Sequence, residues 1–498
     1  MIVTVIIIIS KVVGFVREMV LAAYFGLSVE ADAYSMAFTI VNVLVLLFSA
    51  GIASTFIPLY TKIRYKEGET RANRYAGNIL NLYILCALAG SVLGYLSAPY
   101  VCGILWEGSA QGLEIITRLT RLMYPALVFW AMSGVFVNIL NAREKFVPEQ
   151  LMGFALSFAV IVACVVTGTI DAVAIATAFS ALLQVLILLP FLKGMFKYRF
   201  RLDLSDKNVG LTFRTALPAL VSMGFDEISH LVDRNIGSSF GDGAVSSLAK
   251  SYSLVMLGLG VLVVPITTIM YSKLSKYAVR GEKGRIIETI KQCTEILALV
   301  LLPVMAMAIL LRIDLITVLY QRGKFTHADV LSTAGPFALY FIGLFSFGLR
   351  NFQTRVFFSL RDTKTPMLIG LIAMATDITL NIILSRIIGV QGLTLATSIG
   401  ATLGALIMLV VLRRKLGKMK LKRTILELIK IVVSTLVSAV VMYYVRGYMM
   451  QFEGGLLFLI GRMLVCGIAG LIAYIACAYL LRVRELRAVA QIIKKRTI

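Results

Sequence analysis

Residues 391–424 read QGLTLATSIGATLGALIMLVVLRRKLGKMKLKRT. The first part, 391–412, contains no charged side chain, and a helix needs about 20 mostly apolar residues to cross the hydrocarbon core of a bilayer. The second part, 413–424, contains seven lysines and arginines. Loops rich in Lys and Arg stay on the cytoplasmic side of a membrane. The stretch therefore predicts a membrane-spanning helix that ends at the cytoplasmic surface.

Apolar runs of similar length recur along the whole chain. Of its 498 residues, 59% are hydrophobic and 15% are charged, whereas soluble domains carry about 25% charge. This composition excludes a water-soluble enzyme and a disordered chain. The runs lack the alternation of barrel strands, so we expect an all-α polytopic membrane protein with 14 transmembrane helices. The expected spans are 2–25, 33–60, 76–98, 114–139, 149–166, 172–192, 211–237, 245–271, 287–311, 330–358, 366–387, 391–412, 425–446 and 456–481.

The positive charge falls almost entirely on one side of these spans. Alternate loops and the C-terminal tail contain 32 lysines and arginines, whereas the loops on the other side contain only Arg322 and Lys324. This asymmetry predicts that both termini are cytoplasmic. These basic loops also account for most of the net charge of +23. We expect them to contact membrane lipids, and we expect no nucleic acid partner. We expect 2–25 to be a retained first span, not a cleaved signal peptide.

A weak internal repeat divides the chain. The segment LNAREKFVP at 140–148 opens the fifth span, and LRDTKTP at 360–366 opens the eleventh in the same way. Spans 1–6 and 7–12 therefore look like two pseudo-symmetric six-helix lobes, an architecture typical of transporters with the substrate path between the halves. Chance similarity between apolar helices is the alternative. The expected domains are a first lobe at 1–194, a basic linker at 195–210, a second lobe at 211–415, and two further helices with a basic tail at 416–498.

Charged residues inside the first span are candidates for substrate binding. Lys11, Arg17 and Glu18 lie within 2–25. A charge at the middle of a membrane helix costs about 2.5–3.5 kcal/mol on insertion scales, so such residues usually face an aqueous cavity. Lys11 and Glu18 are seven residues apart and share a helix face.

The seventh span is the repeat partner of the first and has more charges. Asp226, Glu227, Asp233 and Arg234 lie within 211–237. We expect the three carboxylates to bind a coupling cation, H⁺ or Na⁺, and Arg234 to contribute to substrate binding. The alternative is that these charges pair with one another and have a structural role.

Other charged residues lie nearer the ends of spans. Lys250, Arg350 and Arg355 are further candidates for the substrate site. The alternative for all three is that their long side chains extend to the membrane surface. Asp32 opens the second span, where a helix cap is the alternative.

Motifs for catalysis are missing from the sequence. Its two histidines are far apart, and there is no phosphate-binding loop, nucleophile elbow or HExxH motif. Loops of about 20 residues are too short for a catalytic or nucleotide-binding domain. We therefore expect a transporter without enzymatic activity, with no cofactor other than a coupling ion or the membrane potential.

The sequence resembles the MurJ (MviN) family of the multidrug/oligosaccharidyl-lipid/polysaccharide exporter superfamily. The segments that carry the resemblance are SKVVGFVRE at 10–18, FG at 25–26, ADAY at 31–34, LYQRGKFT at 319–326 and DTKTP at 362–366. The resemblance covers nearly the whole chain. It implies fourteen spans, with a lipid-tail groove at the last two. It also implies a flippase for lipid II, the undecaprenyl-diphosphate peptidoglycan precursor, in the bacterial cytoplasmic membrane.

The resemblance also assigns individual residues. It implies that Lys11 and Arg17 are cationic cavity positions, that Glu18 stands where an acidic residue is usual, and that Asp32 matches a family aspartate. Asn42 matches the asparagine of span 2, which in the family is followed by an arginine and here by Val43.

A second departure lies in span 8. The Arg and Glu expected there correspond to Ser253 and Met256. Arg234, Lys250, Arg350 or Arg355 would then have to contact the phosphates in place of the missing arginines.

Three functions remain open at this point. The first is a flippase that moves lipid II from the inner to the outer leaflet by alternating access between the lobes. The second is transport of another cargo, either a different polyprenyl-linked glycan or a drug exchanged for a cation. The third is a scaffold that recruits cell-wall synthesis enzymes without transporting anything.

Overall fold

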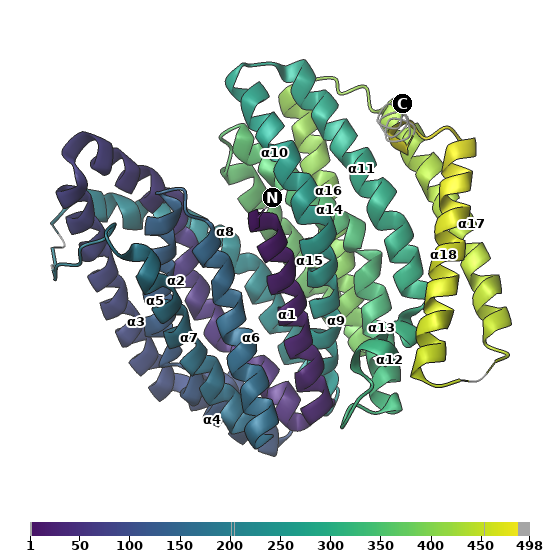
Figure 1. The fold of residues 1–498 in the computed structure, drawn as a ribbon, viewed down its shortest axis with the longest axis horizontal. Helices are drawn as coiled ribbons and strands as arrows, with labels where there is room; N and C mark the ends of the chain where they lie inside the picture. Colours follow the sequence, from purple (N-terminus) through teal and green to yellow (C-terminus); the bar gives the residue numbers. More distant parts are fainter. Residues whose placement is uncertain (1, 201, 204, 453, 487–498) are drawn as a thin grey trace. The chain divides into compact units, whose positions relative to one another are not determined.

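The structure is a computed structural model that describes residues 2–200, 202–203, 205–452 and 454–486. Within these ranges the side chains of 2–5, 46–54, 213 and 215–226 are not described. Every regular element of the described part is a helix (Figure 1). The expected all-helical membrane architecture is therefore confirmed.

The helices follow the predicted apolar runs closely. Their bounds are α1 (Ile2–Phe25), α2 (Val29–Glu67), α3 (Glu69–Leu105), α4 (Ala110–Met123), α5 (Ala126–Asn141), α6 (Val147–Thr167), α7 (Ile170–Leu192), α8 (Lys207–Ser238), α9 (Ala244–Gly258), a π-helical segment (Leu259–Val263), α10 (Val264–Val279), α11 (Lys283–Leu310), α12 (Arg312–Tyr320), α13 (His327–Ile342), α14 (Leu344–Ser359), α15 (Lys364–Ile388), α16 (Val390–Leu416), α17 (Lys422–Met449) and α18 (Leu456–Leu480).

Each of the fourteen predicted runs coincides with one helix or one series of helices. Two runs are broken: α4 and α5 meet at 46°, and α13 and α14 meet at 44°. Pro125 and Gly343 occupy these breaks. Among the described residues, nine helices are long and apolar enough to cross a membrane, or eleven if each bent pair counts as one span. The full count of fourteen and the side of the termini stay predictions.

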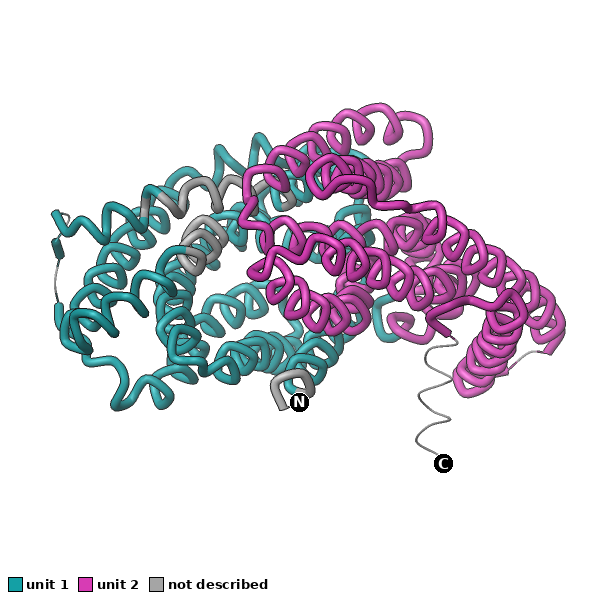
Figure 2. Tube along the Cα trace, turned by 90° about the horizontal axis from the view of Figure 1, so that it is seen from above, with its two compact units in different colours: residues 1–249, 322–325 teal, residues 250–321, 326–498 magenta. Residues whose placement is uncertain are grey.

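The chain forms two compact units (Figure 2). Unit 1 comprises Met1–Ala249 with Arg322–Phe325, and unit 2 comprises Lys250–Gln321 with Thr326–Ile498. The boundary lies within α9, not in the basic linker predicted at 195–210. The reason is that α8, expected in the second lobe, packs along α2 in unit 1. The two six-helix lobes predicted from the repeat differ in kind from these contact-based units, and they stay a prediction.

Unit 1 is held together by two buried apolar clusters. One contains Phe25 and Trp106, and the other contains Phe56, Tyr60 and Tyr75. The rings of Phe56 and Tyr75 stack with their centroids 5.4 Å apart. Burying a large side chain contributes about 1.5–3 kcal/mol, so these clusters fix α2 against α3 and α4. In unit 2, α17 and α18 pack side by side (Figure 1).

The linkers that carry the repeat share one backbone geometry. The N–H of Lys145 donates to the carbonyl of Leu140 at 2.9 Å, and the N–H of Asp362 donates to that of Phe357 at 3.0 Å. The residue before each donor is left-handed, with φ of 61° and 59°. This six-to-one bond with a left-handed residue is a Schellman helix end. Each linker also follows a bent helix pair, an agreement that chance similarity of apolar helices does not explain.

Candidate functional site

The charged residues of α1 differ in their surroundings. Lys11 is exposed, whereas Arg17 and Glu18 are each about four-fifths buried. Arg17 Nη2 lies 2.7 Å from Glu18 Oε1, and Nε of the same guanidinium lies 3.3 Å from that oxygen. The pair neutralises part of the Arg17 charge. Among the described residues Nη1 of Arg17 has no such bond, so this cation keeps donors for an anionic ligand.

Asp32 connects two helices. Its side chain is 1% exposed. Its two carboxylate oxygens accept hydrogen bonds from the N–H groups of Gly243 at 2.7 Å and Ser246 at 2.6 Å. These donors belong to the first turn of α9, where a carboxylate is stabilised by unpaired N–H groups and by the helix dipole. Ser28 caps α2 itself. Asp32 is therefore a cap for α9 supplied by α2, and both of its oxygens are occupied.

Two further polar contacts lie next to Asp32 on α2. The hydroxyl groups of Tyr34 and Thr177 are 3.0 Å apart, which links α2 to α7. The guanidinium of Arg234 on α8 donates to the carbonyl of Ser35. The first two turns of α2 thus contact α7, α8 and α9 through polar groups. We call this set of contacts, with Asp32, the α2 hub.

The three carboxylates predicted to bind a coupling cation lie on α8, and the structure describes the side chains of two of them. Asp233 is 2% exposed, and its Oδ2 lies 3.6 Å from Nδ1 of His230 one turn earlier. Glu227 is half-buried. The side chain of Asp226 lies outside the described residues. Asp233 and His230 therefore form a pair that neither interpretation of this span named, and the ion-binding role of the carboxylates stays a prediction.

The loop before α13 packs onto the end of α1. The N–H of Lys324 donates to the carbonyl of Ala23 at 2.8 Å. Gly323 is left-handed, with φ of 58°, and a Cβ there would collide with that carbonyl. Only glycine adopts this backbone without strain at such a close approach. The sequence analysis identified this loop only as a family motif. Gly323, between Arg322 and Lys324, is the residue that could have indicated a close contact.

The remaining candidates belong to unit 2 or lie elsewhere on α2. Lys250 is 6% exposed on α9, and Arg350 is half-buried with its stem beside Gly404. Nη1 of Arg355 donates to the hydroxyl of Thr268 at 3.3 Å. Asn42 is half-buried on α2. The cavity predicted to join the residues of both units stays a prediction.

Comparison with known proteins decides the family. The family model described as lipid II flippase MurJ matches residues 21–462, which include most of the helices named above. This chain belongs to the MurJ family. The match includes the α2 hub and the loop that contacts Ala23, so these contacts lie in the part of the chain that the family defines.

Relatives agree along the length of the chain. A probable lipid II flippase MurJ of Thermotoga maritima is 27% identical over 484 residues, which covers 96% of this chain and 95% of the relative. A probable lipid II flippase MurJ of Vibrio cholerae is 29% identical over 412 residues, covering 79% and 78%. This MurJ family member therefore spans nearly the full length of the first relative.

Solved structures show the same fold. A structure described as lipid II flippase MurJ in an inward closed conformation has a TM-score of 0.79 at 23% identity and covers 97% of this chain and 99% of that one. An inward-facing multidrug resistance MATE family transporter has a TM-score of 0.72 at 14% identity, covering 83% and 96%. The chain thus shares its fold with that MurJ structure and with this MATE family transporter.

Proposed function

We propose that this protein moves lipid II from the inner to the outer leaflet of the bacterial cytoplasmic membrane. The observation that carries the proposal is the match of the lipid II flippase family over residues 21–462. The absence of catalytic motifs in the sequence and the transporter fold both support transport over catalysis. The proposed topology has fourteen spans, with both termini in the cytoplasm, as the loop charges predict.

The cations of α1 supply the proposed binding chemistry. Lipid II carries a diphosphate, and Lys11 is exposed while Arg17 keeps unused donors. A guanidinium binds phosphate oxygens through two parallel hydrogen bonds. Glu18 lowers the net charge beside Arg17 and fixes the guanidinium, which favours release of the diphosphate after transport. Lys250, Arg234, Arg350 and Arg355 are proposed to add positive charge in place of the family arginines that are missing.

The α2 hub is proposed to hold one of the two states of the transport cycle. Asp32, the Arg234 contact and the bond from Lys324 to Ala23 join the predicted outer ends of α1, α2, α8 and α9. Exposing the headgroup to the outside requires these few hydrogen bonds to break. Each is worth about 0.5–3 kcal/mol, so a bound substrate can offset their loss and shift the population of states.

The coupling ion is part of the proposal. Asp233 is a buried carboxylate of α8 and lies within ion-pair distance of His230. We propose that the carboxylates of α8 bind H⁺ or Na⁺ and that no other cofactor takes part, with the membrane potential as the other energy source. Transport that is unaffected by both ion gradients would leave the potential as the driving force.

Complementation tests the proposed function. A bacterial strain depleted of its own flippase would be supplied with the wild-type gene, with Lys11→Ala/Arg17→Ala, or with the control Lys66→Ala/Arg74→Ala. The control removes two exposed cations of the cytoplasmic ends of α2 and α3. We expect growth and lipid II on the outer surface with the wild type and the control only. Full growth with the α1 double variant at equal membrane levels would contradict the proposed anion site.

One other cargo has specific support. The likeness to a MATE transporter, with a TM-score of 0.72, and the carboxylates Glu227 and Asp233 on α8 favour drug exchange for a cation. Efflux of ethidium or norfloxacin from whole cells would show this activity. A different polyprenyl-linked glycan, or recruitment of cell-wall synthesis enzymes without transport, is distinguished by lipid II accessibility in depleted cells.

A further inference from the structure

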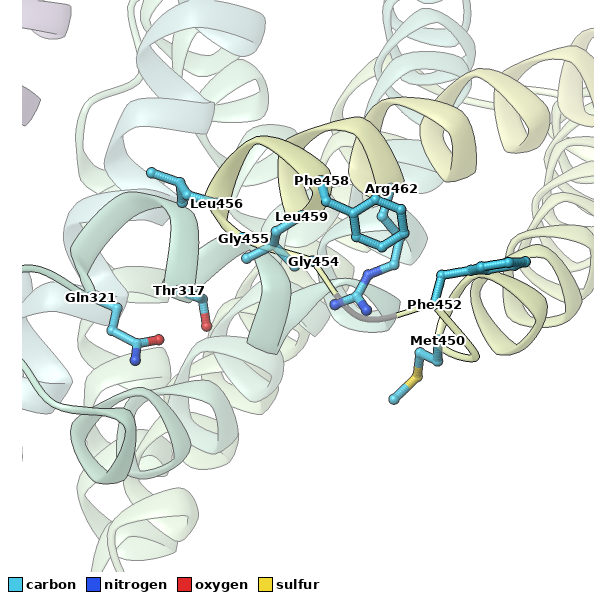
Figure 3. Close-up of a pocket in the computed structure, with 10 residues that line it drawn as sticks. All are labelled: Thr317, Gln321, Met450, Phe452, Gly454, Gly455, Leu456, Phe458, Leu459 and Arg462. Carbon is cyan, nitrogen blue, oxygen red and sulfur yellow. The ribbon is translucent and has the colours of Figure 1, made fainter.

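A hollow of about 610 Å³ lies in unit 2, between α12 and the turn that joins α17 to α18 (Figure 3). Thr317 of α12 lies on one side, and the aromatic rings of Phe452 and Phe458 lie on the other. Arg462 of α18 also lines it. The volume is in the range of small-molecule sites. None of the residues proposed above for lipid II transport belongs to it.

Arg462, the charged residue that lines the hollow, belongs to an ion-pair triad with an excess of positive charge. Asp314 on α12 is 3% exposed and pairs with two arginines. Its Oδ2 lies 3.1 Å from Nε of Arg446, and its Oδ1 lies 2.5 Å from Nη2 of Arg462. Two cations around one carboxylate leave one positive charge uncompensated within this triad.

Arg462 has an unused donor. Its Nε is buried and, among the described residues, has no hydrogen-bond acceptor. A buried donor without a partner costs about 1–3 kcal/mol, and more when it is charged. Turning the guanidinium so that Nε faces an anionic oxygen in the hollow would remove this cost. The first turn of α18, which follows Gly455 and has no side-chain cap, lines the same hollow and offers further unpaired N–H groups.

We expect the hollow to lie at the depth of lipid headgroups. Tyr443, Tyr444 and Tyr448 lie on the last turns of α17, and each is more than 60% exposed. Exposed tyrosines gather where the apolar core of a membrane meets its headgroups. The same helix end leads into Phe452 at the edge of the hollow. The loop charges predict that this end faces outside, where basic residues are scarce, so Arg446 and Arg462 are not explained as topology signals.

We propose that this hollow binds the phosphate group of an anionic lipid in the outer leaflet. The phosphate would accept hydrogen bonds from Arg462 and from the N-terminus of α18, because a planar guanidinium suits phosphate oxygens. The acyl or prenyl chain would lie along the exposed apolar face of α18, where Leu457 and Leu464 are 86% and 60% exposed. The site does not depend on which cargo the protein transports.

Native mass spectrometry of the full-length protein in detergent tests this site. The probes are phosphatidylglycerol, phosphatidylethanolamine, undecaprenyl phosphate and inorganic phosphate. We expect one saturable adduct with an anionic lipid, and roughly tenfold weaker binding of phosphatidylethanolamine because its headgroup carries no net charge. Tighter binding of undecaprenyl phosphate than of phosphatidylglycerol would identify a polyprenyl carrier as the lipid. Binding of inorganic phosphate without a lipid adduct would overturn the proposal.

Variants locate the adduct. Arg462→Ala leaves Asp314 paired with Arg446 and should weaken binding of the anionic lipid about 10- to 100-fold, the worth of one or two charge-assisted hydrogen bonds. Thr317→Trp fills the hollow without touching the ion pairs and should abolish the adduct. The matched control is Arg386→Ala. Arg386 is an exposed arginine near the C-terminal end of α15, which is predicted to face outside as well. Wild-type affinity in both Arg462→Ala and Thr317→Trp would overturn the site.

Discussion

Replacing Asp32 by asparagine should loosen the predicted outer ends of the helices in unit 1. Asparagine has the same shape, but its amide nitrogen would face an N–H donor of α9 and could not accept its hydrogen bond. The change removes one of two charge-assisted bonds, at 2.7 and 2.6 Å, together with the charge at the helix N-terminus. These losses amount to about 2–3 kcal/mol. The open state should therefore gain roughly 30- to 160-fold in population.

Labelling kinetics measure this change. Leu27 lies beside Gly243, at the turn that the Asp32 contact holds in place. A Leu27→Cys variant would be treated with a membrane-impermeant maleimide from outside the cell. We expect the additional Asp32→Asn change to raise the labelling rate at least tenfold.

The control for this experiment is Asp171→Asn. Asp171 is 43% exposed and pairs with Arg118 at 2.9 Å, and an exposed ion pair is worth about 0–1 kcal/mol. The labelling rate should change less than fivefold. Equal rates with Asp32→Asn and Asp171→Asn would refute the role of Asp32 in closing the helix ends.

Three further predictions concern stability. Gly323→Ala should lower the melting temperature of the purified protein by several degrees, because the added Cβ collides with the Ala23 carbonyl and the left-handed backbone is strained. Arg143→Ala should cost about 2–4 kcal/mol, because its guanidinium bonds a tyrosine hydroxyl, a carboxylate and a carbonyl at 2.9, 2.5 and 2.6 Å. Burial raises the pKa of Asp362, but bonds from Lys415 and a threonine outweigh it and lower the pKa to about 2. Asp362 therefore stabilises the fold above its ordinary pKa of 3.8, and the melting-temperature difference between wild type and Asp362→Asn should shrink as the pH falls from 5 toward 2.

Each stability prediction has a matched control. Gly284→Ala adds a Cβ in open space with no left-handed backbone, so its melting temperature should match the wild type. Arg74→Ala removes an exposed cation and should cost less than about 0.5 kcal/mol. For Asp362, the control is Lys418→Ala. In this background the pH-dependent difference in melting temperature caused by Asp362→Asn should remain, whereas Lys415→Ala should reduce it. A Gly323→Ala protein as stable as Gly284→Ala, or a pH-independent effect of Asp362→Asn, would contradict these assignments.

The sequence predicted the helices well because hydrophobic length is a strong signal. Each of the fourteen apolar runs contains helix. The short helix α12 was missed because nine residues with Arg312 and Asp314 among them do not form an apolar run. The bends at Pro125 and Gly343 were also missed, since a proline or glycine within a run does not by itself fix an angle.

The site was only partly predictable. Burial cost in a membrane pointed to Arg17, and the family resemblance pointed to Asp32, but neither indicated the partners of these residues. Glu18 is adjacent in sequence to Arg17, yet the helix geometry separates neighbouring side chains by about 100°. Asp32 meets backbone groups 211 and 214 residues away, and a backbone donor leaves no signature in the sequence. Such contacts follow from tertiary packing of α2 against α9, which residue patterns do not encode locally.

The central claim is that the cations of α1 bind a lipid-linked diphosphate during its transfer between leaflets. The direct measurement is transport of fluorescent lipid II in vesicles containing the purified protein, scored by accessibility to a reagent outside. We predict transfer with the wild type and with Lys66→Ala/Arg74→Ala, and transfer at the rate of protein-free vesicles with Lys11→Ala/Arg17→Ala. Wild-type transfer by that double variant would contradict the account.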